Sequence, residues 1–308
     1  MKHKENFFVR LKKDIVRNKW KYFLIIPVVI YFIIFHYKSM YGLVIAFQKF
    51  RPARGISGSE WVGLYHFERL FSDIYFPRSL RNTLLISALT LIFSFPVPII
   101  FALILNECRV SWFKRIIQTV TYMPHFISLV VVCGLVSTFC SSEGFINQIL
   151  GFVGIESKES LLTKPELFYA IYILSGIWQN FGWDSIIYLA TLSGIDVEQY
   201  EAAKIDGASR LQQMRYITLP GLVPTASMLL ILKIGGLLSV GYEKIILLYN
   251  DLTYEVADVL STYTYRKGLI DGEYSYSAAV GFFNSVVNII LLVMANKLSK
   301  KAGQSGIF

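Results

Sequence analysis

A short stretch of the chain combines aromatic and polar side chains of the kinds that bind sugars. Aromatic rings stack on the apolar faces of sugars, and amide or carboxylate oxygens accept hydrogen bonds from hydroxyl groups. The candidates are Trp178, Asn180, Trp183, Asp184 and Tyr188. On a helix the last four lie at i, i+3, i+4 and i+8 and share one face, whereas Trp178 points about 200° away from Asn180. The stripe predicts either a surface that could contact a sugar or a packed polar seam with interfacial aromatic rings.

Two charged residues interrupt long apolar stretches: Asp184 lies within 167–191, and Lys233 lies within 222–240. Ionisable side chains are costly inside a membrane and often mark functional sites. The expected depths of these two differ by ~7 Å, within reach of a lysine side chain, so they predict either substrate contacts or a mutual structural ion pair. His125 could also donate a hydrogen bond to substrate, although a packing or helix-end role is the stronger interpretation.

No pattern in the chain indicates catalysis. The Gly-x-x-x-x-Gly-Lys-[Ser/Thr] loop that holds ATP phosphates is absent, as are the HExxH and GxSxG motifs. His3, His36 and His66 form no metal-ligand set, and the three cysteines form no CxxC pair. The sequence therefore predicts a chain that is not an enzyme and has no ATP site, cofactor or metal of its own.

The elements that position these residues are predicted from the composition. Of 308 residues, 54% are hydrophobic and 17% are charged, which excludes an ordinary water-soluble enzyme. Long charge-free runs are typical of membrane-spanning helices, which need about 20 apolar residues each. We therefore expect an all-α integral membrane protein with six spans, at approximately 22–43, 82–105, 116–139, 167–191, 222–240 and 276–296.

The charge distribution predicts the orientation. The segment 1–21 carries eight Lys or Arg and two acidic residues, which places it in the cytoplasm. With alternating spans, the C-terminal tail 298–308 is also cytoplasmic, and the basic excess falls on the inner side. The weak point is the first outer loop, 38–81, with seven Lys or Arg. The net charge of +9 thus reflects membrane topology, in a plasma membrane, and indicates no nucleic-acid partner.

The inner loop between the fourth and fifth predicted spans has the pattern of a docking surface. Asp196 is a suitable N-cap for a helix over 197–206, and Gly207 can supply the positive φ that ends it. A second short helix over 208–217 is expected to run to Pro220. Ala202 and Ala203 make one helix face thin, so that another protein can approach closely, while Glu201 and Asp206 place charge at its edge.

This loop resembles the EAA loop of binding-protein-dependent ABC importer permeases. The matching text is Glu201-Ala202-Ala203, three residues, Gly207, nine residues, Ile217, one residue, and Leu219-Pro220. The wider similarity covers about 80–297, the type I importer transmembrane domain, and is nearest to the carbohydrate-uptake branch with its maltose, glycerol-phosphate and polysaccharide permeases. Weaker support for that branch comes from three segments, 123–128, Gly176-x-Trp178-x-Asn180, and 206–208.

The resemblance implies a mechanism and a set of partners. The EAA loop would form a coupling helix in a cleft of a cytoplasmic ATPase, with Glu201 pairing a basic residue there and Gly207 allowing the bend. Two ATPase subunits, either a homodimer or shared with other systems, would bind ATP and Mg²⁺. A second homologous permease and an external solute-binding protein would complete the importer, and the outer loops 48–81 and 241–277 are expected to contact that binding protein.

The resemblance also implies a domain division and leaves two alternatives. The divisions are a cytoplasmic tail (1–21), a first span with its outer loop (22–79), the transport domain (80–297) with the coupling loop 196–220, and a second tail (298–308).

The substrate could be a non-sugar solute such as an amino acid, peptide or phosphate, because all these importers share the EAA loop. An ATP-independent carrier is the least favoured alternative, since it would have no use for a docking loop.

Overall fold

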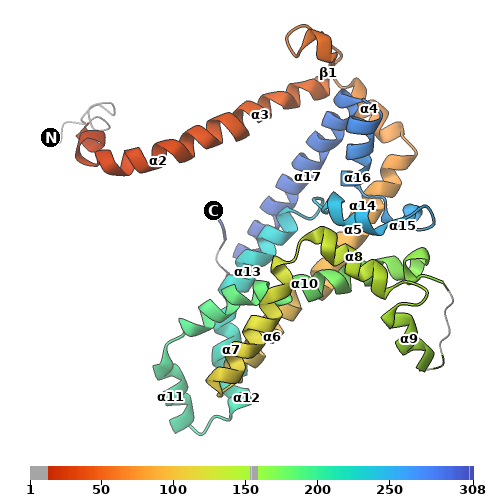
Figure 1. The fold of residues 1–308 in the computed structure, drawn as a ribbon. Helices are drawn as coiled ribbons and strands as arrows, with labels where there is room; N and C mark the ends of the chain where they lie inside the picture. The colour runs from red at the N-terminus through yellow and green to blue at the C-terminus, as the bar shows by residue number, and fades with distance from the viewer. Residues whose placement is uncertain (1–12, 153, 155–158, 305) are drawn as a thin grey trace.

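The computed structural model describes residues 13–152, 154, 159–304 and 306–308, so most of the predicted tail 1–21 lies outside the described residues. The described chain is almost entirely helical (Figure 1). Its longer helices are α2 (Lys19–Tyr31), α4 (Tyr65–Ser72), α5 (Tyr75–Ser94), α6 (Pro96–Glu107), α7 (Ser111–Tyr122), α8 (Leu129–Phe139), α9 (Phe145–Phe152), α10 (Pro165–Ser193), α11 (Val197–Ile205), α13 (Leu219–Gly235) and α17 (Tyr274–Lys301). The short helical segments are η1 (Phe32–Tyr37), α3 (Lys38–Met40), η2 (Tyr41–Phe47), η3 (Pro52–Arg54), η4 (Met123–Phe126), η5 (Leu161–Thr163), α12 (Arg210–Gln213), η6 (Met214–Thr218), α14 (Tyr242–Leu248), α15 (Tyr254–Ala257), α16 (Leu260–Tyr265) and η7 (Arg266–Ile270).

The expected membrane-spanning character is confirmed by four continuous helical stretches within the described residues. They cover Lys19–Phe47, Tyr75–Glu107, Arg210–Gly235 and Tyr274–Lys301, and each is long and apolar enough to cross a bilayer. The fourth predicted span, 167–191, lies within α10, a single helix of 29 residues. The total of six spans and the side on which each terminus lies stay predictions.

The predicted span over 116–139 is not a single helix. The chain bends by 99° between Ser111–Phe126 and Leu129–Phe139. Pro124 lies in the short segment η4 before the bend, and Ser128 caps α8 by accepting a hydrogen bond from the Val131 N–H. The charge-free run over 116–142 predicted one span, but it contains a proline and a serine cap, which together end one helix and begin another.

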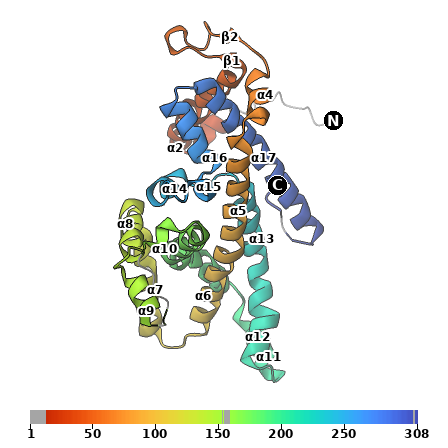
Figure 2. The same ribbon diagram turned by 90° about the vertical axis from the view of Figure 1, so that its right-hand side faces the viewer.

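The outer layer, defined here as residues 48–81 and 241–277, is folded rather than loop-like. It holds α4, the start of α5, and the three short helices α14, α15 and α16. It also holds a small departure from the all-α expectation, an antiparallel ladder between β1 (Gln48–Lys49) and β2 (Glu60–Trp61). Figures 1 and 2 show this ladder and α4 at the end of the molecule opposite α11 and α12.

The N-terminal helix projects away from the bundle as a separate arm (Figure 1). None of the residues in α2 is buried, and its large apolar side chains are about half exposed or more. The arm joins the bundle at η2, where the Phe47 ring packs edge-on against Phe282 of α17 with centroids 5.6 Å apart. The rest of its apolar surface therefore faces lipid or another chain.

Two apolar clusters hold the bundle together at different levels. One joins the outer layer to α17 and to the segment that follows α13, and its buried members are Leu70, Phe76, Leu238, Leu260, Tyr263, Tyr276 and Val280. The other joins α6, α10 and α13 near the coupling loop through Ala102, Tyr188, Leu192 and Leu222. Because α10 and α13 pack together in this second cluster, Lys233 on α13 lies close to the predicted polar stripe on α10.

Candidate functional site

The predicted docking loop forms a hairpin of two helices, α11 and α12, at one end of the molecule (Figures 1 and 2). Asp196 caps α11 by accepting a hydrogen bond from the Glu198 N–H at 3.0 Å. Gly207 has φ +79°, and the Ala208 N–H donates to the Ala203 carbonyl at 2.8 Å, so the expected left-handed turn is confirmed. A hydrogen bond of 3.0 Å between the Tyr200 and Thr218 hydroxyls ties the two arms of the hairpin together.

The expected second helix, over 208–217 and ending at Pro220, is wrong in its extent. Ser209 and Gln212 form a capping box that starts α12, and the helix then continues through η6 into α13 as far as Gly235. The wide π-helical turn of η6 precedes Pro220, which lies in the first turn of α13. Proline has no backbone N–H to donate, and the widened turn before Pro220 accommodates it. The helix therefore continues past Pro220 without ending.

The hairpin leaves apolar side chains uncovered. The exposed fractions are 65% for Val197, 87% for Ile205 and 77% for Leu211, which are unusual values for residues of this kind. The residues of the EAA pattern lie among them: Glu201, Ala202, Asp206, Gly207, Leu219 and Pro220 are exposed, and Ala203 and Ile217 are half-buried. An exposed apolar helix with a carboxylate at its edge suits insertion into a groove of another protein.

The polar stripe on α10 borders a cavity of about 500 Å³ between α6, α10 and α13. Its lining includes Trp183, Asp184, Tyr188 and Lys233, four of the predicted candidates. A second cavity of about 450 Å³ shares Phe95 and Lys233 with the first and extends along α5. Lys233 lines both cavities, and Asp184 lines the first.

Asp184 and Lys233 form an ion pair within this cavity. The Lys233 Nζ lies 3.3 Å from Asp184 Oδ2, and the two side chains are 44% and 37% exposed. Lys233 occupies the last turn of α13, which ends at Gly235 although the predicted span continued to residue 240. The early end coincides with Gly235 and Gly236, since glycine has a low helix propensity. The pair is thus open to the cavity, where a ligand can reach both charges.

His125 and Asn180 join the same region from the side of the bend. The His125 Nδ1 lies 3.0 Å from the Asn180 Oδ1, and the His125 ring stacks on Trp183 with centroids 4.6 Å apart. Trp178 lies elsewhere: it lines a separate apolar pocket of about 260 Å³ with residues of α8. Tyr188 is buried except for 2% of its surface. Trp178 does not join the predicted candidates that come together around Trp183. These are five: His125, Asn180, Asp184, Tyr188 and Lys233.

Two close approaches around α10 could not be predicted from residue types. Gly182 packs directly against the backbone of α7 at Thr121, so that a side chain there would clash. Gly176 lies under the ammonium group of Lys244, which is 8% exposed and donates a hydrogen bond of 2.8 Å to the Tyr172 carbonyl. These contacts explain why glycines occur in a helix that otherwise has large side chains.

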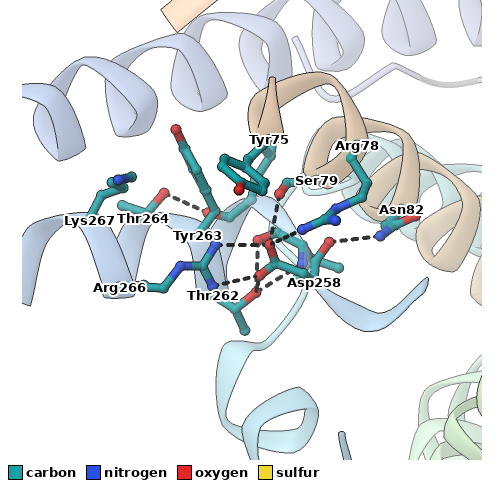
Figure 3. A network of polar contacts seen from close by, with 12 residues as sticks. Tyr75, Arg78, Ser79, Asn82, Asp258, Thr262, Tyr263, Thr264, Arg266 and Lys267 are labelled. Atoms are coloured by element: carbon teal, nitrogen blue, oxygen red, sulfur yellow. Dashed lines mark hydrogen bonds and ion pairs between the residues drawn. The ribbon is translucent and has the colours of Figure 1, made fainter. Parts of the chain in front are cut away.

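The outer layer contains a buried carboxylate network that the sequence did not indicate (Figure 3). Asp258 has a fully buried side chain and accepts two hydrogen bonds from the Arg266 guanidinium, at 3.1 and 3.0 Å. It also accepts hydrogen bonds from the hydroxyls of Ser79 (3.1 Å) and Thr262 (2.8 Å). The network therefore fastens the outer end of α5 to α16. Asp258 and Ser79 are 179 residues apart, so their pairing has no local signal.

Comparisons with known proteins agree with this architecture. The family model described as "Binding-protein-dependent transport system inner membrane component" matches residues 94–304. The chain is 48% identical over 97% of its length to the Bacillus subtilis "Polygalacturonan/rhamnogalacturonan transport system permease protein YteP", covering 93% of that protein.

Solved structures of similar sequence confirm the fold. One is a chain of a bacterial ABC transporter that imports the acidic polysaccharide alginate (TM-score 0.86, 45% identity, 95% of this chain and 99% of that chain). Another is a chain of a bacterial alginate ABC transporter in complex with a periplasmic protein that holds an alginate pentasaccharide (TM-score 0.88, 44% identity, 97% and 100%). The resemblance drawn from the EAA loop is therefore confirmed, and this chain belongs to the family of inner membrane components of binding-protein-dependent transport systems.

Proposed function

We propose that this chain is a permease subunit of an ABC importer for acidic oligosaccharides built from uronic acids. The observation that carries the proposal is the full-length similarity to a permease named for polygalacturonan and to chains of an alginate importer. In the proposal, residues 80–297 form half of the translocation path, and a second homologous permease forms the other half. An external solute-binding protein delivers the substrate to the outer layer.

The cavity around Lys233 is the substrate path in this proposal. Trp183 offers an aromatic face beside the Asp184–Lys233 pair, and the pair is open to the cavity rather than sealed in the protein. A uronate carboxylate can replace Asp184 as the partner of Lys233, since both groups are carboxylates. Asp184 then holds the lysine in place while the path is empty. His125 and Asn180 orient Trp183 through the ring stack and their hydrogen bond.

The hairpin at 196–220 transmits ATP-driven motion. Two ATPase subunits bind ATP and Mg²⁺, and α11 inserts into a groove of one of them through its exposed apolar side chains. Glu201 pairs with a basic residue in that groove, and Gly207 provides the turn that lets α12 lie back against α11. When the ATPases close, the hairpins of the two permeases approach each other, and the helices tip between inward-facing and outward-facing arrangements.

Reconstitution of the whole importer tests this function. Proteoliposomes holding both permeases, the ATPase and the binding protein are given radiolabelled trigalacturonic acid or its carboxyl-reduced, neutral trisaccharide. We expect ATP-dependent uptake of the acidic form, and loss of ATPase copurification when Glu201→Ala and Gly207→Asp are combined. Uptake of the neutral form alone would overturn the substrate class, and ATPase binding that survives the double substitution would overturn the coupling role.

A further inference from the structure

The chain between α13 and α14 leaves the helical path although the apolar run of α13 continues into it. This segment, called the break and defined as residues 236–241, follows Gly235 and precedes Tyr242. Within a membrane, irregular backbone is tolerated where it is buried in protein or lines a cavity and its polar groups find partners. The break does line the 450 Å³ cavity that also contains Lys233, through Gly236, Leu237, Ser239, Val240 and Gly241.

Asn288, in the middle of α17, holds the centre of the break. Its Oδ1 accepts a hydrogen bond from the Leu238 N–H at 3.1 Å, and its Nδ2 donates to the Ser239 hydroxyl at 3.0 Å. The Nδ2 also donates to the Asn284 Oδ1, one turn away, at 3.2 Å. An amide inside an apolar helix costs free energy unless it is paired, and here both ends of the amide are paired.

Two serines from other helices hold the break on either side of its centre. The Ser87 hydroxyl of α5 donates a hydrogen bond to the Leu237 carbonyl. The Ser261 hydroxyl of α16 donates to the Val240 carbonyl at 2.7 Å. Side chains from three helices that are far apart in the sequence thus pair with backbone groups that a regular helix would have paired internally. The break keeps its path because of these hydrogen bonds.

The same face of α17 also fixes the end of α13. A side chain at Gly235 would clash with the side chain of Leu292, so α13 packs closely on α17 at this point. Leu292 lies four residues after Asn288, on the same face of the helix. Lys233 lies only two residues before Gly235 and lines the same cavity as the break. One face of α17 therefore sets the position of the cavity wall relative to the Lys233 ammonium group.

We propose that Asn288 is a positioning residue of the substrate path, which acts from behind the cavity wall and holds the break in the shape that binds sugar units. The inference rests on the proposed function, because it takes this cavity as the path of an oligosaccharide. Without Asn288 the break populates other conformations, and the apparent affinity falls by the fraction that stays competent to bind. The wall changes in shape and not in charge, so acidic and neutral sugars lose affinity together.

The test compares Asn288→Ala with Asn284→Ala, which removes an amide that contacts Asn288 from one turn away. Binding of trigalacturonic acid and of its carboxyl-reduced trisaccharide to the solubilised permease–ATPase complex is measured by calorimetry, beside the basal ATPase activity. We expect Asn288→Ala to weaken binding of both trisaccharides by about tenfold and Asn284→Ala by less than about twofold. Basal ATPase activity should be unchanged in both variants, because neither residue lies near the hairpin.

A second arm measures the order of the break without any sugar. A nitroxide is attached at Gly241→Cys in a chain whose three native cysteines are replaced by alanine. Gly241 has φ −62°, and elsewhere in the described chain no heavy atom lies within 4 Å of a Cβ placed there, so a side chain fits. We expect Asn288→Ala to speed the nitroxide motion seen by electron paramagnetic resonance and Asn284→Ala to leave it unchanged. A residue that only adds to overall stability would not alter this signal.

Each other outcome overturns the inference. Faster motion with unchanged affinity would show that the shape of the break does not matter for binding, and weaker binding with an unchanged spectrum would show that Asn288 acts elsewhere. If Asn288→Ala does not assemble, Ser261→Ala releases the Val240 carbonyl instead; we expect the same changes at about threefold, and their absence would refute the role. A wild-type complex that ignores both trisaccharides would refute the proposed function, while the spectrum still decides whether Asn288 holds the break.

Discussion

Replacing Asp258 by alanine tests how much the buried network stabilises the outer layer. The substitution removes the acceptor of both Arg266 hydrogen bonds and that of the Ser79 hydroxyl, and it leaves Arg266 beside Arg78 with no carboxylate between them. Breaking one partner of a buried ion pair costs about 3–5 kcal/mol. The Arg266 side chain is 27% exposed and can turn toward water, so we expect about 3 kcal/mol.

Thermal unfolding of the solubilised complex measures this loss. With about 2–4 °C of shift per kcal/mol, Tm should fall by roughly 6–12 °C in Asp258→Ala and by about half as much in Asp258→Asn, which keeps one acceptor oxygen. Asp271→Ala is the matched control, because that carboxylate is 37% exposed and pairs with Lys267 four residues away. An exposed pair contributes about 0–1 kcal/mol. A shift in Asp258→Ala no larger than that of the control would refute the reasoning.

Substitutions at three further positions test the packing of α10, the hairpin and the charged pair. Gly182→Ala brings a side chain against the α7 backbone at Thr121, so we expect a loss of about 1–3 kcal/mol in a thermal unfolding assay, and an unchanged Tm would contradict the close packing. Gly207→Ala forces φ +79° on a residue that disfavours it by about 1–2 kcal/mol, so stimulated ATPase activity should fall, whereas Gly207→Asn should retain more of it. Lys233→Gln should raise the KM for acidic substrate about tenfold with little change for a neutral analogue, while an equal effect on both would show a structural ion pair with Asp184.

The parts of the fold that the sequence predicted are those with a local cause. Asp196 and Gly207 act within a few residues, as a helix cap and a left-handed turn, and both were predicted at the positions where the structure has them. Apolar runs likewise predicted most long helices. The pairing of Asp184 with Lys233 could be anticipated as one of two outcomes, because two charges in lipid at similar depth have few other partners.

The parts that were missed depend on contacts between distant residues. The 99° bend falls in a run whose apolar character is the same for one straight helix and for two crossed ones. The helices of the outer layer are too short for a clear periodic signal, so the sequence predicts only a loop over 241–277. Asp258 and Arg78 come together only after α5 and α16 have packed, and neither has a motif to mark it.

The continuous helix from Arg210 to Gly235 links the hairpin rigidly to the charged pair at the cavity. Lys233 lies 23 residues beyond Arg210, or about 35 Å along the axis, so tilting this rod by about 10° at the hairpin would displace Lys233 by about 6 Å. That displacement exceeds the 3.3 Å separation of Lys233 from Asp184, which sits on a different helix. If the hairpin couples to an ATPase as proposed, a small rotation there is enough to make or break this one ion pair, and the cavity can then exchange a ligand without a large rearrangement of its walls.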